Sequence, residues 1–212
     1  MDEESEQLLV ELVERQRNSY FGKYRGMVKT VGSDADLGYI TAIVPEIYGD
    51  TEESPWAAPA VPFAGASHGL AAFPEVDDGV WIEFEAGDIS RPIWTGFWWA
   101  DGEMPEPKGI LTRAFITTAG HKLILDDDAG EVTLLHSDGA EMTMTGSDIT
   151  IKIGQATISM SDSEISLKVG SAATAPSVKI STSEIELKSG TTGVIKISTS
   201  GVDIGNGAVK TM

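Results

Sequence analysis

The sequence contains no cysteine, only three histidines, and fewer than half as many basic as acidic residues. Without cysteine, neither a disulfide bond nor a thiolate metal site can form. The net charge of −18 argues against nucleic acid as a partner, because phosphate binding needs a basic surface. No apolar run approaches the length of a transmembrane helix, and the acidic start lacks the character of a signal peptide. We therefore expect synthesis in the cytoplasm without export by a signal peptide.

The last third of the chain contains a fourfold repeat. Its copies begin at Met142, Ile158, Val178 and Ile195. In each copy, two apolar residues stand two positions apart, and a second such pair begins seven residues after the first. Only Ser, Thr, Gly, Asp or Glu lie between the two pairs. Apolar residues at every second position point to one face of a strand, so each repeat predicts a strand, a tight turn and a second strand.

These short strands are too one-sided to bury their apolar row alone, because repeated units of this kind are stable only when stacked. We expect several copies of the chain to associate around a shared apolar axis, with a closed symmetry that hides strand edges. The predicted core residues are Met142, Met144, Ile149, Ile151, Ile158, Met160, Ile165, Leu167, Val178, Ile180, Ile185, Leu187, Ile195, Ile197, Val202 and Ile204. An ordinary β-sandwich or an amyloid-like stack is the alternative. The constant seven-residue step argues against a sandwich, and outward charges such as Glu164 and Lys168 argue against uncontrolled stacking.

Composition divides the chain into four segments. Residues 1–19 are predicted to form a helix with a stripe at Leu8, Leu9, Leu12 and Val13, and residues 20–100 a small closed barrel. Residues 101–110 form a linker, and residues 111–212 lead into and contain the repeats. A helix docked on a neighbouring surface and a frayed acidic tail both fit the first segment. The predicted barrel strands are Tyr24–Val31, Gly38–Val44, Gly79–Glu85 and Ile93–Trp99.

Three stretches, Phe21–Pro45, Asp77–Trp99 and Thr117–Glu131, together resemble the central spike proteins of contractile injection machines. These form the baseplate assembly protein V family of phage tails, with the related VgrG-type spikes. The resemblance implies an all-β protein: an N-terminal helix, an OB-fold barrel and a C-terminal trimeric, intertwined triangular β-helix. It also implies a homotrimer, a baseplate hub protein at the barrel end, a PAAR-type tip protein at the C-terminal end, and mechanical action on a target membrane.

Two departures from that family concern its extra domain and its tip. Some of these spikes carry a lysozyme domain between barrel and β-helix, but Asp101–Gly109 has no room for one. Some end in a histidine pair that holds an iron ion, whereas no histidine lies near Met212. We therefore expect a separate protein to cap the end, in contact with Val209, Lys210, Thr211 and Met212.

No constellation of residues predicts an enzyme. His68, His121 and His136 are spread along the sequence, and Asp126-Asp127-Asp128 lacks the spacing of a calcium loop, which favours a solvated turn. Glu83 and Glu85 alternate onto one strand face without an evident partner, and Gly65, Gly69 and Gly79 are too spread for a phosphate loop. The tryptophans between Trp94 and Trp99 favour packing over sugar stacking. We expect no catalytic residue, no cofactor and no bound metal.

The predicted function is that of a structural spike within an assembled tail or injection particle, piercing the target envelope and carrying a tip protein. The alternative is an OB-fold module that binds carbohydrate or protein on a β-repeat stalk, as in an adhesin. An enzyme with an unrecognised site is a third and weaker possibility. The sequence does not distinguish a phage from a bacteriocin or an extracellular injection system.

Overall fold

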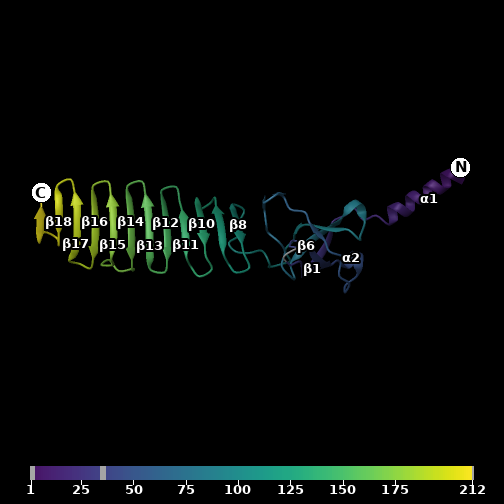
Figure 1. Cartoon of the computed structure of the whole chain (residues 1–212), viewed down its shortest axis with the longest axis horizontal. Helices are drawn as coiled ribbons and strands as arrows, with labels where there is room; N and C mark the ends of the chain where they lie inside the picture. Colours follow the sequence, from purple (N-terminus) through teal and green to yellow (C-terminus); the bar gives the residue numbers. More distant parts are fainter. Residues whose placement is uncertain (1–2, 34–36, 212) are drawn as a thin grey trace. The chain divides into compact units, whose positions relative to one another are not determined.

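The computed structural model describes residues 3–33 and 37–211 and divides the chain into two compact units, one ending at Met104 and one beginning at Pro105. Strands make up most of the regular secondary structure in both units, so the predicted all-β class is confirmed (Figure 1). No sheet is shared between the two units.

The first unit begins with the predicted helix, α1 (Glu3–Arg17). Val10, Leu12 and Val13 are 58, 61 and 47 % exposed on this helix. The side chains of Leu8 and Leu9, the other members of the predicted stripe, lie outside the described part of the structure. The described apolar side chains of α1 are therefore not buried within the chain.

A five-stranded sheet follows, with the spatial order β2-β1-β6-β7-β3. Its strands are β1 (Tyr24–Val31), β2 (Ile40–Ile43), β3 (Ala58–Pro59), β6 (Gly79–Phe84) and β7 (Pro92–Phe97). The four predicted barrel strands are thereby confirmed: β1 has the predicted bounds, and the ends of β2, β6 and β7 differ from the predicted ones by at most two residues. Shorter elements complete the unit: α2 (Pro45–Tyr48), β4 (Ala64–Gly65), β5 (His68–Gly69) and the 3-10 turn η2 (Glu85–Gly87).

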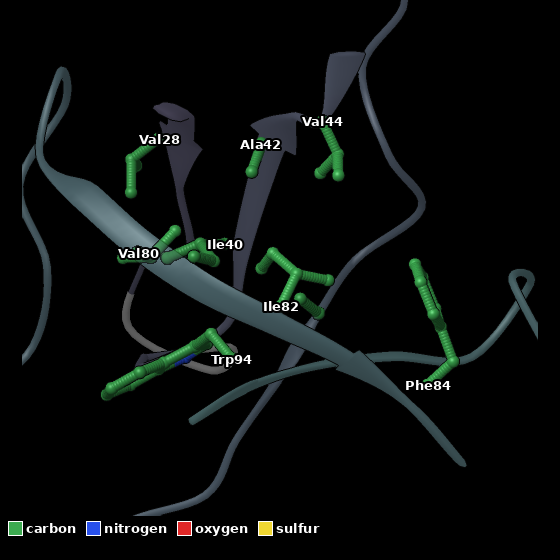
Figure 2. Packing of buried hydrophobic residues seen from close by; sticks show 9 residues of the cluster. Val28, Ile40, Ala42, Val44, Val80, Ile82, Phe84 and Trp94 are labelled. Carbon is green, nitrogen blue, oxygen red and sulfur yellow. The ribbon is translucent and has the colours of Figure 1, made fainter. Parts of the chain in front are cut away.

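The core of this unit follows from the alternation of β6. Val80, Ile82 and Phe84 are buried on one side of the strand, whereas Trp81 and Glu83 between them point to the other. Trp94 from β7 packs into the same cluster and donates its indole N–H to the carbonyl oxygen of Gly38 at 2.7 Å. Figure 2 shows the buried side chains of this cluster, with Val28, Ile40, Ala42, Val44, Val80, Ile82, Phe84 and Trp94 labelled.

Two buried hydroxyl groups join the core to its surrounding loops. Ser54 Oγ accepts a hydrogen bond from the backbone N–H of Ala42 at 3.0 Å and donates to the carbonyl of Pro55 at 2.8 Å. Thr41 Oγ1 donates to the Glu53 carboxylate at 2.7 Å. Since an unpaired buried polar group costs about 1–3 kcal/mol, these bonds hold the loop after α2 against the sheet.

The second unit is one antiparallel sheet of twelve strands in which every strand lies beside its neighbours in sequence (Figure 1). The strands are β8 (Thr112–Ile116), β9 (Lys122–Asp126), β10 (Glu131–Leu135), β11 (Glu141–Met144), β12 (Asp148–Ile153), β13 (Ala156–Ser161), β14 (Glu164–Val169), β15 (Ser177–Ser181), β16 (Glu184–Ser189), β17 (Gly193–Ser198), β18 (Gly201–Ile204) and β19 (Val209–Thr211). At roughly 4.8 Å per strand, such a sheet extends for about 50 Å.

Each predicted repeat is one hairpin of this sheet: β11–β12, β13–β14, β15–β16 and β17–β18. The constant seven-residue step of the sequence corresponds to the short turns inside these hairpins. The variable steps correspond to the connections between hairpins, which all lie at the opposite edge of the sheet because consecutive strands are antiparallel. The sequence did not predict β8 and β19, the two edge strands.

Candidate self-association surface

The sixteen apolar residues singled out in the sequence form two unbroken columns across β11 to β18. In each column, every residue directly faces the next one on the neighbouring strand. The first column is Met142, Ile151, Ile158, Leu167, Val178, Leu187, Ile195 and Ile204. The second column is Met144, Ile149, Met160, Ile165, Ile180, Ile185, Ile197 and Val202. We call this side of the sheet the ladder face.

The columns continue past the predicted residues. Leu134 faces Met142 and Val132 faces Met144, and both columns pass on to β9 at Leu123 and Leu125. The sequence carried a signal for this extension, because β9 and β10 each contain an apolar pair two residues apart. Both pairs lie outside the seven-residue repeat that defined the predicted core.

The ladder face remains uncovered within one chain. Ten of its sixteen predicted residues are 36–46 % exposed, and the other six are half-buried. In the first unit, by contrast, the core side chains are 0–6 % exposed. An apolar surface of this extent, running along a whole sheet, is typical of an interaction site. Whether these residues form the core of a trimer stays a prediction at this point.

The opposite face of the sheet is polar and carries charge-paired columns. In its middle column, Lys179 faces Glu186, and Glu186 faces Lys196. The Lys196 ammonium lies 2.9 Å from the Glu186 carboxylate and 3.5 Å from that of Glu184, and Lys179 lies 2.6 Å from Glu164. This face is therefore compatible with solvent along its length.

These ion pairs shift the pKa of their members. The hydrogen bond from Lys196, and then its charge, hold the pKa of the Glu186 carboxyl below its usual value, while partial burial opposes the shift. The hydrogen bond to Glu186 and its charge raise the pKa of Lys196, and the hydrogen bond to Glu164 raises that of Lys179. These shifts keep Glu186, Lys196 and Lys179 charged near neutral pH.

The turns inside the hairpins are closed by hydroxyl groups. These turns form a row along one end of the strands. We call this row, residues 145–148, 161–164, 181–184 and 198–201, the hydroxyl edge. Thr145 Oγ1 accepts the backbone N–H of Asp148 at 3.1 Å, and Ser181 Oγ accepts that of Glu184 at 3.2 Å. Ser161 makes the same bond within its own turn, to the N–H of Glu164. A side-chain oxygen of this kind stabilises a tight turn by mimicking a backbone acceptor.

The connections between hairpins lie on the other side, which we call the glycine edge, formed by residues 154–155, 170–176, 190–192 and 205–208. Successive connections are joined to one another: Gly170 N–H donates to the carbonyl of Gln155 at 2.9 Å, and Gly190 N–H to that of Thr174 at 3.2 Å. The φ angles of Gly170 and Gly190 are +115° and +74°, a conformation that favours glycine. The two long edges of the sheet are therefore chemically different.

His121 and His136, far apart in the sequence, have ring centroids 4.4 Å apart. They lie just outside the facing pair Lys122 and Leu135, where β9 and β10 end. Each Nδ1 accepts a backbone N–H, from Ser137 at 3.2 Å and Asp138 at 3.1 Å respectively. Sequence reasoning missed this contact, which follows from the register of β9 and β10, because that register places His136 opposite His121. The contacts are those of a structural pair that holds two turns together.

The other polar residues considered in the sequence also have structural partners. Asp126 Oδ1 accepts the backbone N–H groups of Asp128 and Ala129, each at 3.0 Å, which confirms a turn. Glu83 forms an ion pair with Lys23, and Glu85 with Arg91, so the two carboxylates that seemed unpartnered in the sequence are both paired. Within residues 3–33 and 37–211, no cluster of three or more His, Cys, Asp or Glu side chains is suited to a metal ion.

The tryptophans of the first unit have different environments. Trp94 is buried, whereas Trp98 is half-buried and donates its indole N–H to the carbonyl of Val80 at 3.1 Å. The Arg25 guanidinium lies 5.1 Å from the ring centre of Trp98 and 5.6 Å from that of Trp81, so both rings already stack on a cation. Trp99 is 60 % exposed.

The predicted tip contacts can be placed only in part. Val209 lies in β19 and is 53 % exposed. Lys210 and Thr211 belong to the same strand, but their side chains lie outside the described part, and Met212 lies outside the described residues altogether. Among the described residues, no helix has the length and apolar character needed to cross a membrane.

Two family models match the chain. Residues 24–99 match the type VI secretion system/phage-baseplate injector OB domain. Residues 113–171 match the phage baseplate V C-terminal trimerisation domain. The chain belongs to the phage baseplate V family. No curated protein matches it.

Membership in the phage baseplate V family explains the two units. The five-stranded sheet and its core fall within the injector OB domain, and the first half of the twelve-stranded sheet falls within the trimerisation domain. The baseplate V family has a structural role in the baseplate of a tail or injection particle. The resemblance noted in the sequence is confirmed.

Proposed function

We propose that this baseplate V protein is the homotrimeric central spike of a contractile tail or injection system. Three copies associate through the ladder face, and the resulting shaft is driven through the target cell envelope when the system contracts. The protein has no catalytic task of its own in this proposal. Its role is mechanical, and it rests on a shaft that does not unfold under axial load.

The observation that carries the proposal is the exposed ladder face. An exposed fraction near 40 % of a large aliphatic residue is roughly 70 Å², which at about 25 cal/mol per Å² favours burial by about 2 kcal/mol per residue. Two columns of such residues on each of three copies supply a driving force large enough to offset the repulsion between chains of net charge −18.

The match to a trimerisation domain supports three as the number of copies, and it covers residues 113–171. The two columns continue beyond this match through β15 to β18 without a break in register. We therefore propose that the same association extends along the whole sheet, with the sixteen predicted residues as its core.

The proposed partners at the two ends follow from the family. A baseplate hub protein binds at the barrel end, and a PAAR-type tip protein binds at the C-terminal end, near Val209 and the residues that follow it. The exposed apolar side chains of Val10 and Leu12 on α1 are available for a contact with another subunit or with the hub.

Solution mass tests the proposal directly. Light scattering on the dilute protein should give three times the chain mass of 22.5 kDa. A compact single chain at micromolar concentration would refute the trimeric spike. Electron microscopy of contracted particles, with the protein located by a bound antibody fragment, should then place it at the centre of the baseplate.

The exposed ring of Trp99 favours one second function, a binding module for carbohydrate or protein on a β-repeat stalk. A solvent-facing indole at the surface of an OB domain is a stacking platform for a sugar ring. Glycan-array binding by the intact protein that is lost in Trp99→Ala would support this function over the spike.

A further inference from the structure

Because its strands are paired in sequence order, the sheet can form one complete wall of an assembly. From β8 to β19, every strand is hydrogen-bonded to strands of its own chain. In a strand-by-strand intertwined assembly, the neighbours of each strand would come from other chains. If three copies associate as proposed above, this pairing favours a prism in which each copy supplies one whole face.

Cyclic symmetry then fixes which edges meet. A threefold axis that runs along the stacking direction of the strands rotates each sheet onto the next one. Going around the axis, the glycine edge therefore lies on the same side of every sheet, and the hydroxyl edge on the other side. Each corner of the prism must therefore bring the glycine edge of one copy against the hydroxyl edge of its neighbour. Contacts between two glycine edges or two hydroxyl edges are excluded by the same rotation.

The apolar surface is extended on the side of the glycine edge. There, Ile153 faces Ala156, and Ala156 faces Val169, which adds a third partial column beside the first one. Ile153 and Val169 are 64 and 52 % exposed, more than any described residue of the two main columns between β11 and β18. At the hydroxyl edge the ladder face ends with the second column, followed directly by the turns. The glycine edge therefore carries the larger uncovered apolar surface.

A hollow of about 540 Å³ lies on the same side of the ladder face. Its lining combines first-column residues with residues of the glycine-edge connections. The lining includes Leu167, Val169, Pro176, Val178, Leu187 and Ile204. A hollow with such walls suits aliphatic side chains, and its volume is sufficient for several of them.

We propose that the occupant of this hollow is a second copy of the chain, whose second-column residues at the hydroxyl edge seat in it. Ile180 and Ile185 lie on β15 and β16, two of the strands whose residues line the hollow, and they are 44 and 39 % exposed. They are the side chains that a neighbouring copy presents at the corner. At each corner, the glycine edge of one copy thus contacts the hydroxyl edge of its neighbour. This inference rests on the proposed trimer.

Disulfide trapping tests the corner, because the natural chain has no cysteine to interfere. Thr182 is an exposed residue of the turn between β15 and β16, on the hydroxyl edge. Ser171 and Thr191 are exposed residues of the glycine-edge connections before β15 and after β16. Two double variants are made, Thr182→Cys with Ser171→Cys and Thr182→Cys with Thr191→Cys, and both are oxidised with diamide. A bond within one chain is excluded, because strands of about five residues hold the edges roughly 17 Å apart and a disulfide needs Cα atoms within about 7 Å.

At least one double variant should run as a covalent trimer on a denaturing gel. The three single variants are the matched controls and should stay at the mass of one chain, because a threefold axis never brings two copies of the same edge together. Cross-linked dimers from a single variant would contradict the assignment of edges.

A third variant tests whether one chain forms one face. Ser159 and Ser166 face each other across β13 and β14 on the polar face. The variant Ser159→Cys with Ser166→Cys should form its disulfide within one chain, with no covalent trimer. A covalent trimer from this variant would show that neighbouring strands belong to different chains.

Light scattering on every variant distinguishes failure of the corner contact from failure of the trimer itself. If the mass is that of a trimer but neither corner double cross-links, the corner is wrong and the trimeric spike stands. If the mass is that of a single chain, the proposed function fails and the corner fails with it.

Discussion

Ile165 on β14 directly faces Ile180 on β15, yet the two side chains are 46 and 44 % exposed. A facing pair of isoleucines in the middle of a twelve-stranded sheet is ordinarily a core position. Their exposure in the single chain is the clearest indication that the sheet is one part of a larger assembly.

Ile165→Asp should abolish trimer formation. The substitution places an unpaired carboxylate on the axis once per copy, and the desolvation of an unpaired charge costs several kcal/mol. Analytical ultracentrifugation should show single chains or aggregates. Ser166→Asp, next to it on the polar face and opposite Lys179, should leave the trimer intact. A stable trimer from Ile165→Asp would exclude the ladder face as the interface.

Acid should weaken the β15–β17 part of the sheet. The pKa of Glu186 is lowered by its bond to Lys196, so its contribution to stability is present above the unfolded-state pKa and is lost as pH falls through the folded-state pKa. The melting temperature should therefore decrease on acidification below the ordinary range of a glutamate. Glu186→Gln removes the titrating group, so its melting temperature should be lower at neutral pH and should change less on acidification.

Tyr48→Phe should destabilise the OB domain by about 1 kcal/mol, because the hydroxyl donates to the carbonyl of Ile89 at 2.5 Å. Burial, with a smaller contribution from the charge of Asp88, raises the pKa of Tyr48 to about 12. Stability from this group is thus present below the usual tyrosine pKa and is lost as pH rises through about 12.

Spectrophotometric titration at 295 nm checks the assignment. One of the four tyrosines should ionise late in the natural protein, and this late component should be absent from Tyr48→Phe. Four tyrosines that ionise together would contradict it, and urea unfolding of the two proteins gives the difference in free energy.

Trp99→Ala should leave both trimer mass and assembly into particles unchanged if the protein acts as a spike. The indole is exposed and makes no contact on which the OB core depends, so folding should also be unaffected. Loss of an affinity for glycans in an otherwise intact trimer would instead favour the adhesin-like function. Trp94→Ala, which empties a buried core position, is the contrasting variant and should unfold the domain.

The sequence predicted the strand pattern and the two-column surface well, because both follow from local periodicity. Apolar pairs such as Ile158 and Met160 share a face on any strand, and the constant seven-residue step sets the turn between two strands. The stretches Phe21–Pro45, Asp77–Trp99 and Thr117–Glu131 were also enough to indicate the baseplate V family. The contact between His121 and His136 was missed because it depends on the register of β9 and β10 rather than on any motif.

The sequence by itself determined that the last third forms short, one-sided strands whose apolar residues cannot be buried alone, since alternation and turn chemistry are local properties. Only the tertiary structure decided that consecutive strands pair in order, that Ile165 faces Ile180, and that the variable connections all lie on one edge. Those choices depend on which strands are hydrogen-bonded to which, and the same apolar pattern is compatible with pairing inside one chain or between several. Strand pairing depends on hydrogen bonds between segments that local periodicity does not relate, so only the backbone geometry of the folded chain shows it.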